Sequence, residues 1–581
     1  MADRVNHNPL GEFGISTNFP RSVHTADSFK KDEPPLKLLR ELTRLQHERG
    51  YVDDESLREL AVQLNVPLYR LEGLVSFYTS FRRKPPPRTT IQVCRDVTCM
   101  MAGCASATQS LLKQGSEQLD LKIEEVSCLG RCDAAPAASV NETPIAPWTL
   151  KNPDHIARLI EQPSPLAASA DTESPRTWRS DPYAGPGEHY HTARQLVTSR
   201  KDVAAVCVQR LNESRLRGMG GAGFPTGRKW ELVANETESP KYVICNADES
   251  EPGTFKDRLL LAELPHLVIE GMLLAGLTIG SETGIIFLRH EYGPEKQRIE
   301  AALVDAHARG MLGKNVAGSG QAFDIQIFES PGGYILGEET ALLEALEDKR
   351  GEPRNKPPYP GSRGLWGKPT LINNVETLAL AVPIIHHGPA WWDAQGLGDY
   401  CGLKFISISG DVEKPGVYEI PVGTTVAQAI ELAGGMKDRM QLKAFLPGGA
   451  SSNFLPASHA TTAIDFESMN QAGSMLGTGA IIVMSDQRDL FAIATNLVRF
   501  FRNESCGKCV PCRTGSEYAV RLLEGIRSGR HTPSEIQVLD DLADTLEQTS
   551  ICGLGQVALN PLLSMLKHFP QEIPADTANH E

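Results

Sequence analysis

The sequence lacks an excess of positive charge, a long apolar run and a secretory N-terminus. Its 581 residues carry a formal net charge of −14, so a nucleic-acid partner is not expected. The longest apolar stretch, residues 267–280, is interrupted by Glu270 and is shorter than the about 20 residues that a membrane-spanning helix needs. No apolar segment follows a basic start at the N-terminus. We therefore expect a cytoplasmic protein without direct membrane insertion.

Aromatic residues are few, at 6%, but 41% hydrophobic and 22% charged residues are typical of a folded globular protein. A chain of this length is too long for one core and predicts about three to five domains. Periodicity and composition predict a multidomain α/β protein. Its expected parts are a helical module at 36–86, a small α/β domain at 88–162, a Pro/Ser/Ala/Gly-rich linker at 163–190, an α/β sheet domain at 191–400, a β-grasp domain at 403–486 and a helical bundle at 489–575.

Within these parts the pattern predicts several local features. The first helical module should break at Gly50, with Asp53 or Asp54 capping the next helix. Residues 193–216 carry helix signals, and residues 242–247 indicate a strand.

Twelve cysteines in a reducing compartment are better candidates for metal ligands than for disulfides. Cys506, Cys509 and Cys512 follow one another at two-residue spacing, and Cys552 comes forty residues later. A triplet of this kind with a fourth, remote cysteine is typical of a 4Fe-4S cluster. Zinc and purely structural thiols are the alternatives, although structural zinc sites more often use two separate pairs.

A second, looser set consists of Cys94, Cys99, Cys128 and Cys132, two pairs that could close around a 2Fe-2S cluster. Zinc or unrelated core cysteines remain alternatives, and Cys104 lies close enough to confuse the assignment. The isolated cysteines, which are expected to be small buried hydrophobes, are Cys207, Cys245 and Cys401.

Glycines recur between residues 218 and 223, as Gly218-x-Gly220-x-x-Gly223. This pattern matches the dinucleotide-binding fingerprint, but the preceding residues indicate a helix and not the usual strand. Many carboxylates follow the loop, which is unusual around phosphates unless they bind ribose hydroxyls or ring N–H groups. A flavin with a nicotinamide nucleotide fits this pattern better than the alternative, a set of acidic caps and turns.

Long stretches of the sequence resemble a known family. RGMGGAGFPTGRKW, CNADESEPGTFKD, GGYILGEETALLEALEDKRGEPRNKPPYP, GLWGKPTLINNVETLA and ESCGKCVPCRTG with SICGLGQ are similar to the NADH-oxidising flavin subunit of respiratory complex I. Residues 36–162 resemble the small thioredoxin-like 2Fe-2S subunit of that complex, here fused in front. Such fusions are similar to the diaphorase subunits of soluble NAD-dependent formate dehydrogenases and NAD-reducing hydrogenases.

The resemblance implies a Rossmann-like domain that binds FMN and NAD(H), one 2Fe-2S cluster on the N-terminal set of cysteines and one 4Fe-4S cluster on the C-terminal set. The residues expected to bind FMN are Gly218, Gly220, Gly221, Lys229, Asn246, Asp248, Glu249, Tyr334, Gly337, Glu338, Asn373 and Asn374. Those expected on the NADH side are Phe224, Lys229, Glu251, Glu339 and Tyr359. Two positions depart from the family pattern: Met219 replaces a frequent arginine, and Tyr359 a frequent phenylalanine.

The resemblance also implies hydride transfer between nicotinamide and flavin, followed by single electrons through iron-sulfur clusters. No catalytic side chain is required for this chemistry. The acidic surroundings should repel a 2′-phosphate, so NAD is expected over NADP.

The second substrate should be handled by a partner, because no molybdopterin or nickel site is recognisable in this sequence. We expect a hetero-oligomer with an iron-sulfur-containing catalytic subunit. Some hydrogenase relatives lack the N-terminal cluster cysteines, whereas all four are present here. The resemblance therefore favours a formate dehydrogenase partner over a hydrogenase partner that handles dihydrogen. A complex I module and a zinc-stabilised nucleotide-binding protein are the remaining alternatives.

Overall fold

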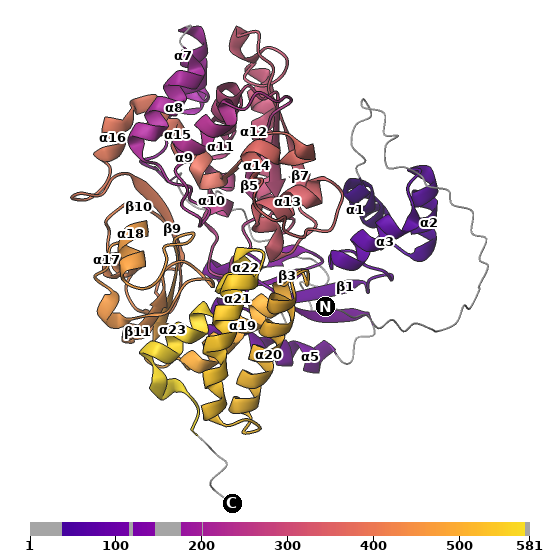
Figure 1. Cartoon of the computed structure of the whole chain (residues 1–581), viewed down its shortest axis with the longest axis vertical. Helices are drawn as coiled ribbons and strands as arrows, with labels where there is room; N and C mark the ends of the chain where they lie inside the picture. Colours follow the sequence, from indigo (N-terminus) through magenta and orange to yellow (C-terminus); the bar gives the residue numbers. More distant parts are fainter. Residues whose placement is uncertain (1–37, 116–119, 146–175, 200–201, 576–581) are drawn as a thin grey trace, which may run out of the picture. The chain divides into compact units, whose positions relative to one another are not determined.

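The computed structural model describes residues 38–115, 120–145, 176–199 and 202–575. The first two residues of the predicted helical module, the end of the predicted 88–162 domain and the first part of the predicted linker lie outside this range. Figure 1 shows the helices and strands along the described chain.

The N-terminal module consists of helices α1 (Leu38–Arg49), α2 (Asp54–Gln63) and α3 (Leu68–Phe77). Gly50 follows α1 with a positive φ of 81°, a conformation that favours glycine. The Asp53 side chain caps α2 by accepting a hydrogen bond from the Ser56 N–H at 2.8 Å. Both the predicted break and the predicted cap are therefore present.

A four-stranded sheet of order β2-β1-β3-β4 forms the next domain. Strands β1 and β2 run parallel with Cys94 opposite Val126, so Cys128 lies just beyond the same edge. This register brings the two predicted cysteine pairs together. The elements are β1 (Thr89–Cys94), α4 (Val97–Met101), α5 (Cys104–Gly115), β2 (Leu121–Val126), β3 (Ala138–Val140) and β4 (Thr143–Ile145).

The central domain is built on a parallel sheet of order β7-β6-β5-β8. Its strands are β5 (Tyr242–Ala247), which coincides with the predicted strand, β6 (Thr283–Leu288), β7 (Asp324–Glu329) and β8 (Thr370–Asn374). The main helices are α8 (Val203–Ser214), α9 (Thr226–Ala234), α10 (Lys256–Glu263), α11 (Pro265–Ile279), α12 (Gly293–Ala308), α13 (Glu339–Leu346), α14 (Pro360–Arg363), α15 (Val375–His387) and α16 (Pro389–Asp393).

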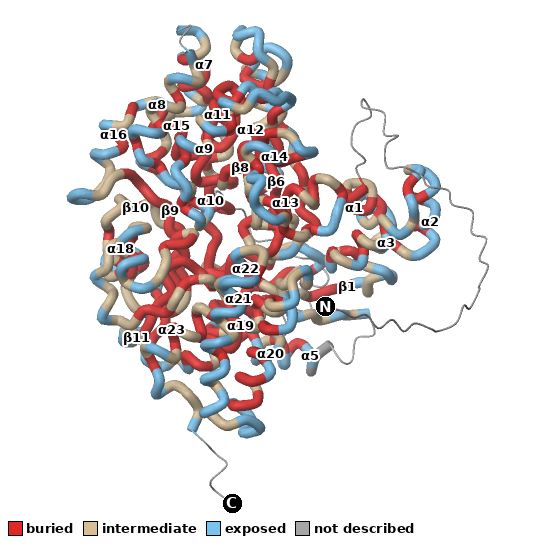
Figure 2. Tube along the Cα trace, viewed as in Figure 1, coloured by how far each residue is buried: buried red, intermediate tan, exposed pale blue. Residues whose placement is uncertain are grey.

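Helix α11 is buried along nearly its whole length, and Figure 2 shows the buried residues concentrated around it and in the neighbouring strands. Among the described residues, no single helix has the length and apolarity to cross a membrane. The bent pair α10 and α11 meets that test only when taken together.

The helix signals over 193–216 correspond to two separate helices. The segment contains α7 (His191–Thr198) and α8, and Asp202 starts the second helix by accepting a hydrogen bond from the Ala205 N–H at 3.1 Å. An aspartate before an apolar helix is a good N-cap. The apolar periodicity continued through this cap and concealed the break.

Residues 176–190, the second part of the predicted linker, pack against two domains. Glu419 of the β-grasp domain accepts hydrogen bonds from the backbone N–H groups of Arg179 at 2.6 Å and Ser180 at 2.8 Å. Trp178 donates to Glu263 of α10 at 2.9 Å. The composition of this part of the predicted linker could not reveal these long-range partners.

The β-grasp domain has a sheet of order β10-β9-β13-β11-β12. It comprises β9 (Leu403–Gly410), β10 (Gly416–Pro421), α17 (Val426–Leu432), β11 (Leu442–Leu446), β12 (Leu455–Pro456), α18 (Phe466–Gln471) and β13 (Ala480–Ser485). The C-terminal helices are α19 (Leu490–Glu504), α20 (Val510–Arg527), α21 (Val538–Thr549), α22 (Gly553–Val557) and α23 (Asn560–His568).

Close packing of α11 on α15 predicts the effect of one substitution. A Cβ at Gly271 would lie 2.2 Å from the Leu378 carbonyl oxygen, so Gly271→Ala must push the two helices apart. We expect a loss of about 1–3 kcal/mol, the usual cost of overpacking, measured by urea unfolding with calorimetry as a second probe. Gly293→Ala is the matched control, because nothing lies within 4 Å of its added Cβ. Equal stability of both variants would contradict the packing argument.

Candidate functional site

The edge of the parallel sheet where β5 and β8 end carries three asparagines. Asn246 on β5 lies opposite Asn374 on β8, and Cys245 lies opposite Asn373. In open α/β sheets, ligands bind outside the carboxyl ends of the strands. The three predicted asparagines are thus gathered where such a fold places its ligand.

The amide groups of these asparagines are oriented by protein partners. Asn246 donates to the Gly337 carbonyl at 2.9 Å, Asn373 accepts from the Trp230 indole at 2.9 Å, and Asn374 donates to Asp257 at 2.6 Å while accepting from Lys256 at 3.3 Å.

The glycine-rich loop, residues 217–225, connects α8 to α9 and does not follow a strand. Its ends are closed by a hydrogen bond from the Gly218 N–H to the Phe224 carbonyl at 2.8 Å. A Cβ at Gly220 would lie 3.0 Å from the Asn374 Cβ. The loop therefore lies directly on the carboxyl end of β8, although its sequence context differs from that of the usual fingerprint.

The β-grasp domain covers the other side of this loop. Gly221 has a φ of 114°, and its Cβ position lies 3.9 Å from the Gly477 backbone. The Phe466 ring of α18 lies 4.5 Å from the Arg217 guanidinium, which also donates to the Gly223 carbonyl at 2.7 Å. The loop conformation thus depends on two domains.

Two predicted carboxylates beside the loop are buried and retain acceptor capacity. Asp248 accepts hydrogen bonds from Ser250 at 2.8 Å and Ser330 at 2.9 Å, and burial raises its pKa to about 6. Glu251 accepts from the Tyr334 hydroxyl, and burial also raises its pKa. A carboxylate has about four lone-pair positions, so both groups can still accept from a ligand hydroxyl.

Glu249 and Glu338 are used mainly by the fold. Glu249 accepts from the N–H groups of Asp257 and Arg258 and from the Tyr292 hydroxyl at 2.9 Å, and burial raises its pKa to about 7. Glu338 caps α13, accepting from the N–H groups of Thr340 and Ala341, each at 2.9 Å. These two carboxylates therefore act as caps and turn acceptors, which is the alternative to ligand binding named for the acidic residues after the loop.

Two lysines and two carboxylates form a charged cluster just after the loop. Lys229 lies 3.4 Å from Glu339, and Lys356 lies 3.5 Å from the same carboxylate and 3.0 Å from Glu338. Burial would raise the pKa of Glu339, but the two lysines hold it below its usual value. Lys356 was missed by the sequence reasoning, because eighteen residues separate it from Glu338 and only the fold brings the two together.

Two side chains that the resemblance assigns to the NADH side are exposed. Phe224 is 48% exposed and Tyr359 is 62% exposed. Met219 points instead into the central core, and its N–H donates to Thr377 at 2.8 Å. Exposed apolar groups beside a polar cradle are typical of a ligand site.

The C-terminal cysteines meet at the start of two helices. Cys509 is the residue before α20, Cys512 lies in its first turn, and Cys552 is the residue before α22. Backbone N–H groups of Leu554 and Gly555 donate to the Cys552 thiol. Burial nevertheless raises the pKa of Cys552 to about 12. Such buried thiols need a cation to become thiolates.

Sulfur spacing tests the zinc alternative. Zinc at about 2.3 Å from four sulfurs would place those sulfurs about 3.8 Å apart. Across the described ranges, no three cysteine sulfurs lie within 4.8 Å of one another. The C-terminal thiols therefore do not form a preformed tetrahedral zinc site.

The N-terminal cysteines form a buried chain of four thiols. Cys94 interacts with Cys99 and with Cys128, and the Cys128 and Cys132 sulfurs are 3.5 Å apart. Hydrogen bonds from Cys132 and Cys94 lower the pKa of Cys128. Two adjacent pairs match the two-iron arrangement. Cys104 packs near Cys99 in the core but lies outside this chain of thiols.

The remaining cysteines behave as predicted for isolated residues. Cys207 and Cys245 are fully buried in the central core, and Cys401 is half-buried at its margin.

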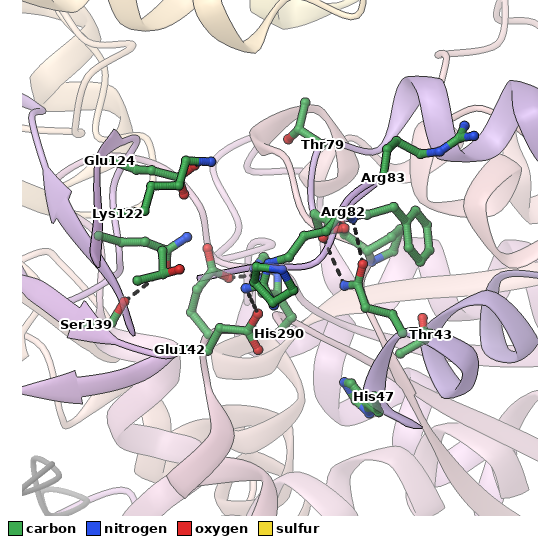
Figure 3. A pocket seen from close by; sticks show the side chains of 18 of the residues that line it. Thr43, His47, Thr79, Arg82, Arg83, Lys122, Glu124, Ser139, Glu142 and His290 are labelled. Atoms are coloured by element: carbon green, nitrogen blue, oxygen red, sulfur yellow. Dashed lines mark hydrogen bonds and ion pairs between the residues drawn. The ribbon is translucent and has the colours of Figure 1, made fainter. Parts of the chain in front are cut away.

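A crevice of about 600 Å³ lies away from the glycine loop, between α1, the 79–87 connection and the first sheet. Figure 3 shows its charged lining. Arg82 is paired with Glu142 at 2.6 Å, and Lys122 is paired with Glu124. These two cations are therefore already paired with carboxylates of the crevice wall.

Four family models match successive parts of the chain. They are the thioredoxin-like [2Fe-2S] ferredoxin over residues 26–162, the Nuo51 FMN-binding domain over 211–383, the SLBB domain over 405–452 and the NADH-ubiquinone oxidoreductase-F iron-sulfur binding region over 492–576. These matches show that the cofactors are FMN, NAD(H), one 2Fe-2S and one 4Fe-4S cluster. The zinc-stabilised alternative is therefore wrong.

The chain is also similar in sequence to subunits of known NADH-quinone oxidoreductases. The F subunit of the NADH-quinone oxidoreductase of Escherichia coli (strain K12) is 39% identical over 410 residues, covering 69% of this chain and 92% of the relative. The corresponding F 2 subunit of Rhizobium meliloti (strain 1021) is 43% identical over 369 residues, covering 63% and 88%.

A solved NAD⁺-reducing [NiFe]-hydrogenase in the H₂-reduced state has a chain that is similar over a longer range. The TM-score is 0.82 at 32% identity, with 94% of each chain covered. This chain thus belongs to the family of NADH-oxidising FMN and iron-sulfur subunits, with a thioredoxin-like 2Fe-2S domain preceding the flavin domain.

Proposed function

We propose that this subunit exchanges electrons between NAD(H) and the catalytic subunit of an NAD-dependent formate dehydrogenase. The observation that carries the proposal is the complete chain of four buried thiols in the N-terminal domain, Cys94, Cys99, Cys128 and Cys132. It gives the fused domain a full ligand set for its cluster. The second substrate would be handled by a hetero-oligomeric partner.

The diaphorase of an NAD⁺-reducing hydrogenase is the second candidate. It is favoured by the similarity over 94% of both chains, which includes the N-terminal fusion. The complex I relatives match a shorter part, 63–69% of this chain. A separate complex I module is therefore the third candidate. The cytoplasmic location stays a prediction.

The residues around the glycine loop would position the two nucleotides. Gly218, Gly220 and Gly221 would let backbone N–H groups approach FMN, while Lys229 would meet its phosphate. Asp248 and the asparagines at the strand ends would accept from or donate to the ribityl chain and ring. Phe224 and Tyr359 offer exposed aromatic faces for adenine, beside Glu251 and Glu339.

When bound, FMN supplies the conversion between a hydride pair and single electrons. The chain's own groups then need only to bind, orient and exclude water. Glu249 and Glu338 would contribute indirectly, by holding the loops that surround the flavin.

The partner can be identified by purifying the tagged chain anaerobically from its native host. We expect NAD⁺ reduction with formate, and molybdenum or tungsten in the complex. Activity with dihydrogen and bound nickel would instead establish the hydrogenase candidate. A quinone-reducing assembly would establish the complex I candidate.

Removing one 4Fe-4S ligand should remove one class of iron. Wild type should contain about six irons, one cube and one rhomb, and Cys552→Ser about two. FMN should remain bound, because the glycine loop belongs to another domain. Cys401→Ala is the matched control and should keep all six irons. Iron analysis and flavin release measure both quantities, and full iron in Cys552→Ser would contradict the ligand assignment.

FMN affinity should depend on the ionisation of Asp248. Without FMN its pKa is about 6, so lowering the pH from 7.5 to 5.5 protonates most of the carboxylate and removes an acceptor for ribityl hydroxyls. The affinity should fall about fourfold from this group alone. Flavin fluorescence quenching on FMN-depleted protein measures it. Asp248→Asn should bind more weakly at pH 7.5 and lose this pH dependence. An unchanged pH profile in the variant would show that another group, such as Glu249, controls binding.

A further inference from the structure

Three buried arginines surround the loop that carries Cys128 and Cys132. Arg289, which follows β6, donates to the Cys128 carbonyl. Arg258 of α10 donates to the Gly130 carbonyl at 2.8 Å. Arg131 of the loop itself binds Glu295 of α12 through two contacts of 3.0 Å. Two of the three guanidiniums are thus supplied by the flavin domain to the 2Fe-2S domain.

Each arginine also has a carboxylate partner. Glu291 lies 2.9 Å from Arg289, and Asp133 pairs with Arg258. Burial would raise the pKa of Glu291, but Arg289 and His290 lower it to about 2. Arg289 therefore faces a fully ionised partner, and removing either member changes the charge beside Cys128 by one unit.

The contacts also orient the loop backbone. With its carbonyls held by Arg289 and Arg258, the loop directs the Gly130 N–H to the Cys128 sulfur at 3.4 Å. Gly130 has a φ of 66°, and a Cβ there would lie 2.8 Å from the Tyr292 ring. The loop is consequently held in a conformation that its own sequence does not impose.

Both features act on the same redox equilibrium. Reduction adds one negative charge to a buried cluster, and hydrogen bonds to sulfur and nearby positive charge raise its potential. An arginine keeps its charge at all physiological pH values. The positive charge of the arginine and its orientation of the loop both raise the midpoint potential of the cluster.

We propose that Arg289 is a positioning residue of the flavin domain that raises the midpoint potential of the 2Fe-2S cluster in the neighbouring domain. The same guanidinium donates to the Glu249 carbonyl beside the FMN site. The potential is then a joint property of the two docked domains. The argument uses the cofactor assignment and is independent of whether the partner handles formate or dihydrogen.

Redox titration of the full-length protein, followed by electron paramagnetic resonance of each cluster, tests this. In Arg289→Gln, the ratio of reduced to oxidised 2Fe-2S cluster at a fixed potential should fall at least tenfold, which is 59 mV for a one-electron couple. Arg289→Lys keeps the charge but not the forked geometry, so in this variant the ratio of reduced to oxidised cluster should fall less. The 4Fe-4S midpoint should not move in either variant.

Glu291→Gln should shift the 2Fe-2S midpoint in the opposite direction, because it leaves Arg289 uncompensated. If Arg289→Gln loses its cluster, the midpoint of Glu291→Gln still tests the proposal. The matched control is Arg309→Gln, another arginine paired with a carboxylate, Asp305 at 2.6 Å. It lies at the far end of α12, about 24 Å along the helix from Gly293. An unchanged midpoint in Glu291→Gln, or equal shifts in the control, would overturn the proposal, whichever partner is found.

Discussion

The geometry of the site depends on one buried carboxylate, Glu376. It lies in the first turn of α15 and binds Lys256 of α10 at 2.8 Å and Lys404 of β9 at 2.6 Å. It also accepts from the Phe405 N–H at 2.9 Å. Charges removed from water are costly unless paired. Loss of Glu376 would take from Lys404 its carboxylate partner and would leave Lys256 paired with Asp257 alone. Burial already lowers the pKa of Lys404 to about 8.

This network explains why distant segments meet at the glycine loop. Helix α15 follows Asn374, α10 follows the Asp248–Glu251 segment, and β9 belongs to the domain that covers the loop. Lys404 also donates to the Thr478 carbonyl at 3.0 Å, next to Gly477, which faces Gly221. The cradle is therefore assembled by interdomain charge pairing and not by a local motif. A second carboxylate, Glu504, acts similarly near the clusters, accepting from Ser127 at 2.5 Å and from the Tyr334 N–H at 2.9 Å.

The sequence was most informative where the chemistry requires a fixed number of ligands at short spacing. The Cys506, Cys509 and Cys512 triplet predicts its cluster because few other centres need that arrangement. Strand 242–247 and the break at Gly50 were likewise predictable, since a short apolar run and turn chemistry are local. The division of the helical segment 193–216 into two helices was not, because apolar periodicity persisted across the cap at Asp202.

Residue roles at the site were harder to predict, because they depend on which atoms the fold already uses. Glu249 and Asp248 are adjacent in sequence, yet Glu249 accepts from three protein groups while Asp248 accepts only from two serine hydroxyls. Lys356 joins the site only through tertiary packing. The three arginines around the Cys128 loop gave no sequence signal, since 127 residues separate Arg131 from Arg258 and 31 separate Arg258 from Arg289.

The fusion of the two iron-sulfur domains has a physical consequence for the function. A 2Fe-2S domain on a separate chain would meet the flavin domain only after association, with the entropy cost that docking entails. On one chain, that cost is reduced by a high effective concentration. If the domains parted, the buried Arg258 would lose both the Gly130 carbonyl and Asp133, and Arg289 would lose the Cys128 carbonyl while keeping Glu291. The linker and the arginine contacts thus favour the same docked state, in which the cluster environment is completed by the flavin domain.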